Sequence, residues 1–234
     1  MKIGVIVATI QEITETRKIL ENVISKNIFD LVFYEGRVSE NEVILVRCGV
    51  GKVNAARTAQ ILIDKYNVDC VINIGAAGGI DSELNIKDIV IGDSLVQYDF
   101  DISALGNSTK GELDGIGTFI KSDTKLVNIC KNILENLENR DFNYKIGTIA
   151  TADIFCADPK IAKEIHQEFG AECVEMEGAA IAQVCFLDDV PFLIIRGISD
   201  SPNGNNGIDY FEYCNIAAKQ ATNILEELIK NYMK

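Results

Sequence analysis

Residues 172–200, ECVEMEGAAIAQVCFLDDVPFLIIRGISD, decide the fold of this chain. They read as a strand over 173–176, an Ala-rich helix over 178–187, and a second strand that begins after Pro191. The second strand, FLIIRGIS, is apolar on both faces, which is typical of a central strand in a buried parallel sheet. The stretch therefore predicts a strand–helix–strand unit of an α/β protein.

Four charged side chains interrupt this apolar frame: Glu175, Glu177, Arg196 and Asp200. Alternation along a strand predicts that Glu175 and Glu177 share one face and that Met176 faces the other. Glu177 and Asp200 stand at the carboxyl ends of their strands, where ligands bind in parallel sheets, so we interpret both as site residues. A buried charge is costly unless it is paired or used, so Arg196 either forms an internal salt bridge with Glu175 or serves the site.

The rest of the chain alternates strand and helix signals without a repeat, a low-complexity tract or a linker. We expect strands over 2–8, 31–37, 42–47, 69–74, 88–97 and 144–149, with a hairpin between the second and third of these. We expect a helix that follows Thr9–Glu12 and runs to about Ile24, helices over 53–66, 126–137 and 210–230, and a further helix that begins at Pro159 after the cap residue Asp158. This pattern predicts a single three-layer α/β/α domain over residues 1–234, with a central, mostly parallel but mixed sheet.

Glycine-rich and turn-forming segments predict the loops. The turn CGVGK over 48–52 lacks the third glycine of a dinucleotide-binding fingerprint and the Ser or Thr that follows Lys in a P-loop. It still lets a ligand approach backbone amides at the start of a helix. The run GAAGG over 75–79 is either a tight turn or a place of close approach to the backbone. Residues 105–116 and 201–207 have turn composition, and we expect loops there.

Composition and charge disfavour several classes of function. The 234 residues carry a net charge of −13, which opposes binding to nucleic-acid phosphates. The seven cysteines are scattered without a CxxC pair, which indicates reduced thiols in a cytoplasmic protein. We expect no signal peptide and no membrane partner, because the apolar runs are too short. The one histidine, His166, lies in a polar helical run, so an HExxH zinc site and a Ser-His-Asp triad are excluded.

Acid–base chemistry in this chain must therefore depend on carboxylates. Glu12 follows the first strand, where it is either a first-turn acid favoured by the helix dipole or a third site residue beside Glu177 and Asp200. Carboxylates without histidine suit the cleavage of a glycosidic bond, in which one acid protonates the leaving group and one base activates water. They also suit a divalent cation, but the spacing of a calcium loop is missing, so we expect no metal.

Several segments resemble those of one enzyme family. The opening KIGVIVAT with Glu12, the turn CGVGKVNAA, the run NIGAAGG, and the segments VEMEG and RGISD are similar to the 5′-methylthioadenosine/S-adenosylhomocysteine nucleosidases. These enzymes are a bacterial branch of the nucleoside phosphorylase family, and the similarity spans nearly the whole chain. The resemblance implies hydrolysis of the N-glycosidic bond of these two nucleosides, with release of adenine, in methionine salvage and methyl-cycle recycling. It implies no cofactor.

The resemblance leaves three alternatives open. They are a phosphate-dependent purine or uridine phosphorylase of the same fold, a nucleosidase that prefers another 5′-substituted adenosine such as aminofutalosine or 5′-deoxyadenosine, and a nucleoside-binding protein without activity. Phosphorylases of this fold hold phosphate with arginines and a hydroxyl near these loops. This chain offers only Arg196 at a matching place, and Ala76 stands where a hydroxyl is expected. We therefore favour water over phosphate as the nucleophile.

The resemblance also implies a chemical role for each matching side chain. Asp200 is the general acid that protonates the purine at N7, and Ser199 orients Asp200. Glu12 activates the attacking water, and Arg196 lies near that water. Glu177 holds the ribose hydroxyls. These roles agree with the chemistry, because an aspartate that acts as an acid near neutral pH needs a raised pKa, which burial and nearby carboxylates supply.

Further residues build the implied pocket. Phe155 stacks on the purine, the backbone of Cys156 bonds the Watson–Crick edge of the base, and the backbone of Met176 helps Glu177 to hold the ribose. The 5′-thio pocket is lined by Val50, Met176 and Tyr210. Leu105 from a neighbouring subunit closes this pocket, which implies a homodimer.

Three residues depart from the family pattern. The nucleosidases usually carry serine where this chain has Ala76, methionine where it has Thr9, and phenylalanine where it has Leu105. Ala76 lacks the serine hydroxyl that helps to position the attacking water in the family. Thr9 and Leu105 change the shape and polarity of the 5′ pocket. We expect these departures to affect the choice of substrate more than the reaction.

Overall fold

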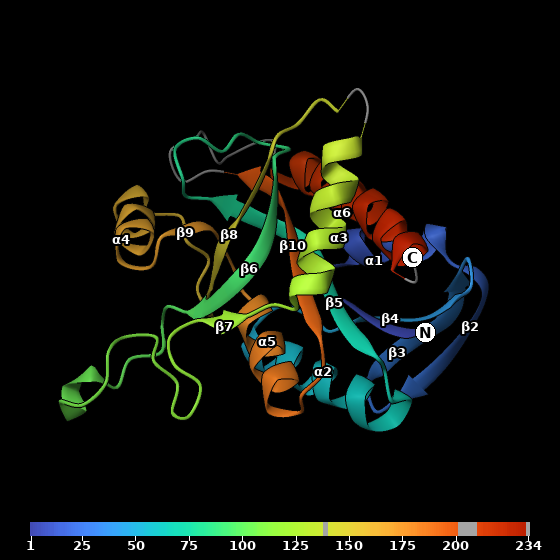
Figure 1. The fold of residues 1–234 in the computed structure, drawn as a ribbon, viewed down its shortest axis with the longest axis horizontal. Helices are drawn as coiled ribbons and strands as arrows, with labels where there is room; N and C mark the ends of the chain where they lie inside the picture. Colours follow the sequence, from blue (N-terminus) through green and yellow to red (C-terminus); the bar gives the residue numbers. More distant parts are fainter. Residues whose placement is uncertain (138–139, 201–209, 233–234) are drawn as a thin grey trace.

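The strands form one mixed sheet in the computed structural model, which describes residues 1–137, 140–200 and 210–232 (Figure 1). In chain order they are β1 (Lys2–Val7), β2 (Glu21–Ile28), β3 (Leu31–Val38), β4 (Asn41–Arg47), β5 (Cys70–Gly79), β6 (Ile89–Gln97), β7 (Ile120–Lys121), β8 (Tyr144–Thr151), β9 (Ala171–Glu175) and β10 (Phe192–Asp200). The order across the sheet is β10-β6-β8-β9-β5-β1-β4-β3-β2, with β7 beside β6. Because β10 also pairs with β5, the strands β5, β10, β6, β8 and β9 close into a ring.

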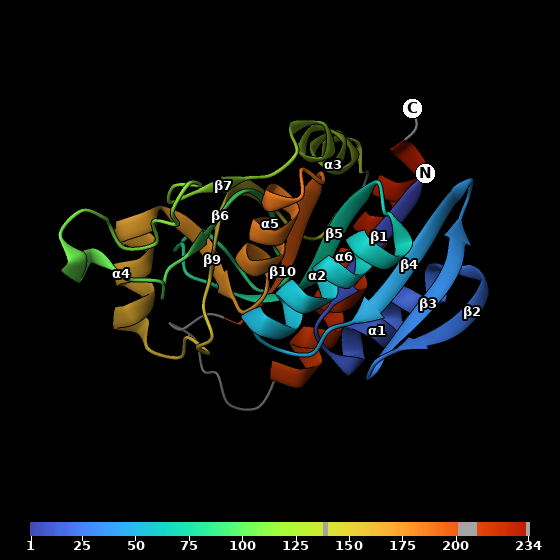
Figure 2. The same ribbon diagram turned by 90° about the horizontal axis from the view of Figure 1, so that it is seen from below.

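The helices cover both faces of this sheet. They are α1 (Ile10–Thr16), α2 (Lys52–Tyr66), α3 (Thr124–Asn136), α4 (Pro159–Phe169), α5 (Gly178–Leu187) and α6 (Tyr210–Asn231), with short 3₁₀ turns η1 (Arg17–Ile19) and η2 (Ser103–Leu105). α1 and α3 pack with α6 on one face, and α2 packs with α5 on the other (Figure 2). α4 lies at the edge beside β8 and β9 (Figure 1).

β10 contributes to the apolar clusters on both faces of the sheet. Leu193 and Ile195 pack in the cluster that contains α3 and α6, whereas Phe192, Ile194 and Ile198 pack in the cluster that contains α2 and α5. Every residue of β10 is buried. The pattern that predicted a central strand is therefore explained, because this strand has neighbours on both edges and helices over both faces.

The helix expected to run to about Ile24 ends at Thr16, so that prediction is wrong beyond this residue. α1 ends there, η1 follows, and the chain then enters β2, which pairs with β3. β2 is an edge strand whose residues are exposed or only partly buried, so its sequence ENVISKNI carries no alternation that marks a strand. The pairing with β3 decides its conformation, as is common for edge strands.

The run GAAGG over 75–79 is part of a strand and not a turn, so that alternative is wrong. β5 continues through Gly79, because it has partners on both sides. Gly75 and Ala76 are in register with Arg196 and Gly197 of β10. The small residues leave room above the strand for the side chains described below, which is the close approach that the other alternative predicted.

The predicted hairpin, the predicted start of α4 and the predicted mixed sheet are confirmed. β3 and β4 form the antiparallel hairpin, and Asp158 caps α4 with Pro159 as its first residue. The sheet is mixed, with parallel pairs such as β1–β5 and antiparallel pairs such as β6–β10. The loop expected over 201–207 lies outside the described residues. Within 1–137, 140–200 and 210–232, no helix has the length and apolar character needed to cross a membrane.

Candidate functional site

One hollow brings together the three carboxylates that the sequence singled out. Glu12, Glu177 and Asp200 all line it, although each comes from a different part of the chain. Glu12 follows β1, Glu177 follows β9, and Asp200 ends β10. The hollow lies at the carboxyl ends of these strands, where ligands bind in α/β sheets.

Glu12 is held in place by backbone amides. Its Oε2 accepts hydrogen bonds from the N–H groups of Ala8 (2.8 Å) and Thr9 (2.9 Å), and its Oε1 accepts one from Ala76 N (3.2 Å). Thr9 caps α1 and accepts a bond from Glu12 N in return, so the pair forms a capping box. Both readings of Glu12 therefore hold at once, because the helix cap also fixes a carboxylate in the wall of the hollow.

Gly75 supplies the space that Glu12 needs. A Cβ atom at Gly75 would lie 2.7 Å from Glu12 Oε1 and 3.1 Å from Arg196 Nη1. Contacts this short require something to move, and the three amides oppose any movement of Glu12.

We expect Gly75→Ala to lower kcat/KM by at least about tenfold, because it displaces Glu12, the carboxylate to which the family resemblance assigns the activation of water. The secondary structure measured by circular dichroism should not change. Gly4→Ala in β1 is the matched control, because its Cβ would be tight only against the flexible side chain of Leu62 at 3.0 Å, with ordinary contacts to Val68 (3.4 Å) and the Cys70 carbonyl (3.5 Å), away from the hollow. Equal kinetic losses in the two variants would contradict this account of Gly75.

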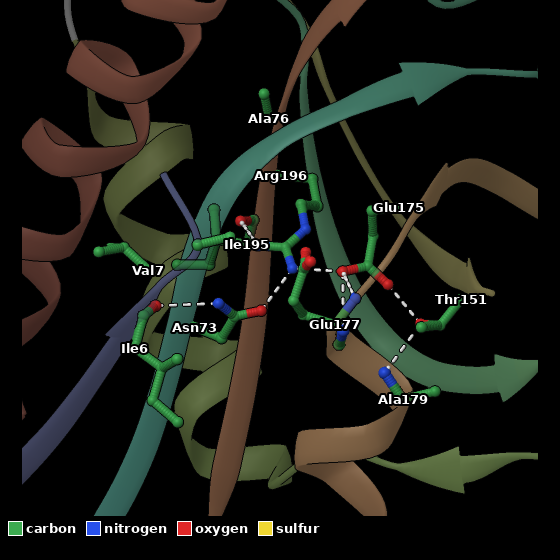
Figure 3. A network of polar contacts seen from close by, with 12 residues as sticks. Ile6, Val7, Asn73, Ala76, Thr151, Glu175, Glu177, Ala179, Ile195 and Arg196 are labelled. Atoms are coloured by element: carbon green, nitrogen blue, oxygen red, sulfur yellow. Dashed lines mark hydrogen bonds and ion pairs between the residues drawn. The ribbon is translucent and has the colours of Figure 1, made fainter. Parts of the chain in front are cut away.

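A buried ion pair joins Arg196 to Glu175, which lines the hollow (Figure 3). Arg196 is only 1% exposed, and its Nη2 donates to Glu175 Oε2 and to Asn73 Oδ1. Glu175 Oε2 also accepts from the N–H groups of Glu177 (3.0 Å) and Gly178 (2.7 Å), so it binds the start of α5. The salt-bridge alternative for Arg196 is therefore correct, and this side chain is not part of the lining of the hollow.

Glu177 is the N-cap residue of α5 and not a strand residue. β9 ends at Glu175, so the predicted alternation over Glu175, Met176 and Glu177 does not apply, and that prediction is wrong. Glu177 Oε1 accepts a hydrogen bond from Gly51 N at 2.8 Å. Burial, followed by the negative charge of Glu175, raises the pKa of Glu177 to about 7.

Asp200 is the last residue of β10 and faces the hollow. It is 8% exposed, and its Oδ1 accepts a hydrogen bond from the Ser199 hydroxyl at 2.7 Å. Burial raises the pKa of Asp200, while the hydrogen bond from Ser199 acts in the opposite direction. A carboxyl with a raised pKa is suited to give up a proton near neutral pH.

The structure places the other predicted residues in three groups. Val50, Ala76, Phe155, Met176 and Ser199 line the hollow. Cys156 is buried and does not line it, and Leu105 is 77% exposed on η2 and does not line it either. The side chain of Tyr210 lies outside the described residues.

Sequence reasoning missed several residues of the hollow and of its support. Gln11, Gly78 and Cys214 line the hollow, and Asn73 and Thr151 hold the buried ion pair. The spacing of Thr9 and Glu12 is a capping-box signal that the sequence offers directly. The other residues have no such signal, because their roles depend on contacts between strands far apart in the sequence.

Comparison with known proteins identifies the family. Residues 2–230 match the family model described as Phosphorylase superfamily. The chain belongs to the phosphorylase superfamily. A 5′-methylthioadenosine/S-adenosylhomocysteine nucleosidase from Tolumonas auensis is 37% identical to this chain over 231 residues. The alignment covers 98% of this chain and 99% of that protein.

Solved structures of superfamily members agree with this relationship. The nucleosidase of the same name from S. pneumoniae, with a transition-state inhibitor, superimposes with a TM-score of 0.93 and 32% identity, covering 99% of this chain and 100% of that one. The futalosine hydrolase of Helicobacter pylori superimposes with a TM-score of 0.91 and 26% identity, covering 98% and 97%. The predicted resemblance to the nucleosidase branch is confirmed.

Proposed function

We propose that this protein hydrolyses the N-glycosidic bond of 5′-methylthioadenosine and S-adenosylhomocysteine and releases adenine. The relatives that carry this name align with nearly the whole chain. The hollow, lined by carboxylates and an aromatic side chain, fits a purine nucleoside. The reaction needs neither a cofactor nor a metal, because a proton and a water molecule are enough to cleave the bond.

The hydrogen bonds that hold Glu12 are the observation that supports water, and not phosphate, as the nucleophile. Backbone N–H groups at strand ends and helix starts are the usual ligands of a phosphate. Here the N–H groups of Ala8, Thr9 and Ala76 already bind the Glu12 carboxylate. A phosphate in this place would lose those donors and meet a negative charge, whereas a water molecule can give its proton to Glu12. This observation favours the hydrolase over the phosphorylase.

Asp200 is the general acid in this proposal. Cleavage of a ribosyl C–N bond passes through an oxocarbenium-like state, so the adenine must leave with its developing charge neutralised by a proton. The raised pKa of Asp200 keeps its carboxyl protonated nearer to neutral pH, and Ser199 fixes the orientation of that carboxyl. The proton goes from Asp200 to N7 of the purine as the bond breaks.

The remaining residues bind the nucleoside. Glu177 accepts hydrogen bonds from the ribose hydroxyls, together with the backbone of Met176, while Arg196 and Glu175 hold the start of α5 from below. The base is held by Phe155 through stacking and by the backbone of Cys156, and the 5′ substituent meets Val50 and Tyr210.

We propose that the protein is a cytoplasmic homodimer in which Leu105 of a second copy closes the pocket. Two lining residues of the hollow and two residues close to them in the sequence are large, apolar and more than half exposed: Val50, Phe155, Val53 and Ile154. Leu105 is also more than half exposed on η2, and contact with a second copy of the chain would remove such apolar side chains from water. Sedimentation equilibrium should give twice the mass of the chain, and a monomer at micromolar concentration would contradict the proposal.

The pKa of Glu177 predicts the acid side of the pH profile. Glu177 must be ionised to accept hydrogen bonds from two hydroxyls, and its pKa of about 7 means that it becomes protonated as the pH falls below that value. We therefore expect kcat/KM to fall about tenfold for each pH unit well below this pKa. Initial rates from about pH 5 to about pH 9 measure this limb, and a flat acid side would contradict the role of Glu177.

A panel of 5′-substituted adenosines tests the proposed function. Free adenine is followed in buffer with and without phosphate, with 5′-methylthioadenosine, S-adenosylhomocysteine, 5′-deoxyadenosine and aminofutalosine as substrates. We expect rapid release of adenine from the first two without phosphate. A requirement for phosphate would indicate a phosphorylase. A strong preference for aminofutalosine would favour the second candidate, which the similarity to a futalosine hydrolase structure supports.

A further inference from the structure

Lys52, Asp99 and Asp153 form a closed ring of hydrogen bonds beside the hollow, and the proposed reaction uses none of them. Asp99 Oδ1 accepts from Lys52 Nζ at 2.6 Å, and Asp99 Oδ2 accepts from Asp153 N at 3.1 Å. Asp153 Oδ1 accepts from Lys52 N at 2.8 Å and completes the ring. The side chains of Lys52 and Asp99 are only 18% and 19% exposed, so water screens this ion pair less than an ordinary surface pair.

The ring joins three segments that are distant in the sequence. Lys52 begins α2, Asp99 follows β6, and Asp153 follows β8. Two of these segments carry walls of the hollow. Lys52 is next to Gly51, whose N–H donates to the Glu177 carboxylate. Asp153 lies in the same short loop as Phe155, which lines the hollow.

Gly51 and Asp153 are packed directly against each other. A Cβ atom at Gly51 would lie 3.1 Å from Asp153 Oδ1, and Gly51 has a φ of +102°, which favours glycine. The Asp153 carboxylate also holds the N–H of Lys52, the residue after Gly51, so its position helps to set the direction of the Gly51 N–H toward Glu177. Asp99 fixes that carboxylate by accepting from the backbone of the same residue.

Hydrogen bonds within the protein occupy the backbone amides that the turn CGVGK was expected to offer to a ligand. The ammonium group of Lys52 is paired with Asp99, and the amides of Gly51 and Lys52 already donate to carboxylates. The two backbone amides are therefore occupied, and the charge of Lys52 is balanced by that of Asp99. A ring of this kind can fix positions, but it does not bind a phosphate.

We propose that Lys52, Asp99 and Asp153 are positioning residues that hold Glu177 and Phe155 in the geometry needed to bind the nucleoside. This inference rests on the proposed function, because it assigns the ring to nucleoside binding and not to the chemical step. Loss of the ring should let the Gly51 N–H turn away from Glu177 and let the loop after β8 shift. A hydrogen bond to a carboxylate that is lost or misdirected weakens binding, while Asp200 and Glu12 stay in place.

Asp99→Asn and Lys52→Met test this inference by steady-state kinetics. An asparagine amide can accept through only one of its two terminal atoms, so Asp99→Asn must lose one bond of the ring. We expect each variant to raise KM about tenfold and to change kcat by less than about threefold. The acid limb of the pH profile should also move to higher pH, because the Gly51 N–H lowers the pKa of Glu177 against the effects of burial, Glu175 and Glu12. Lys52→Arg should restore most of the affinity.

Lys110→Met is the matched control, because Lys110 forms an ion pair with Glu168 at 2.8 Å away from the hollow. It should leave KM and the pH profile unchanged. Should Asp99→Asn fail to fold, Lys52→Met carries the test alone. Variants with the KM and acid limb of the parent, and only a lower melting temperature, would overturn the inference. A parent protein that releases no adenine would instead overturn the proposed function, so the two failures are distinguishable.

Discussion

Asp200→Asn is expected to abolish adenine release while the protein keeps its fold. Asparagine has nearly the same shape and can still accept the hydrogen bond from Ser199, but it has no proton to give to the leaving purine. General acid catalysis typically contributes about 10²–10⁴-fold, so we expect a loss of that size in kcat. The measurement is single-turnover release of adenine, with the melting temperature recorded in parallel.

Two comparisons make this result specific. Asp64→Asn on the exposed face of α2 removes an aspartate far from the hollow and should leave the rate unchanged. Ser199→Ala removes the group that orients Asp200 and should cost much less than the loss of the acid itself. If Asp200→Asn kept turnover within a few-fold of the parent, the assignment of the acid would be wrong.

Glu12→Gln is expected to bind nucleoside analogues and yet fail to hydrolyse the substrate. The glutamine oxygen can accept from Ala8 and Thr9, but its NH₂ group would then face the N–H of Ala76. The variant therefore loses the base and one hydrogen bond, and leaving that buried N–H unpaired costs about 1–3 kcal/mol of stability. We expect kcat to fall by about 10²–10⁴-fold.

Calorimetry with a non-hydrolysable adenosine analogue separates binding from catalysis in this variant. Binding within about tenfold of the parent, together with lost turnover, fits a base that acts in the chemical step. Lost binding would mean that Glu12 supports the structure of α1 and does not act as the base. Turnover close to that of the parent would mean that another group activates the water.

Local patterns in the sequence were sufficient for much of the fold. The apolar run of β10 marked a central strand because it is buried on both faces, and Asp158 with Pro159 marked the start of α4. β2 escaped prediction because an exposed edge strand has no buried face to leave a pattern. The ring closed by β10 also escaped, since it depends on pairing with both β5 and β6, and neither strand adjoins β10 in sequence.

The candidate site was predictable where its residues end a strand or follow one closely. Glu12, Glu177 and Asp200 could be brought together from the rule that ligands bind at the carboxyl ends of strands. The choice between a salt bridge and a site role for Arg196 required coordinates, because only they give its distance from Glu175. Likewise, no spacing in the sequence relates the three members of the ring around Lys52, which meet only in the folded chain.

We propose that Glu12, Glu177 and Asp200 act together to break the bond between ribose and purine by the addition of water. The most direct test is to run the reaction with 5′-methylthioadenosine in ¹⁸O-labelled water that also contains phosphate, and to analyse the sugar by mass spectrometry. We predict a 5-methylthioribose that carries one ¹⁸O atom at C1. A sugar 1-phosphate without the label would contradict the account.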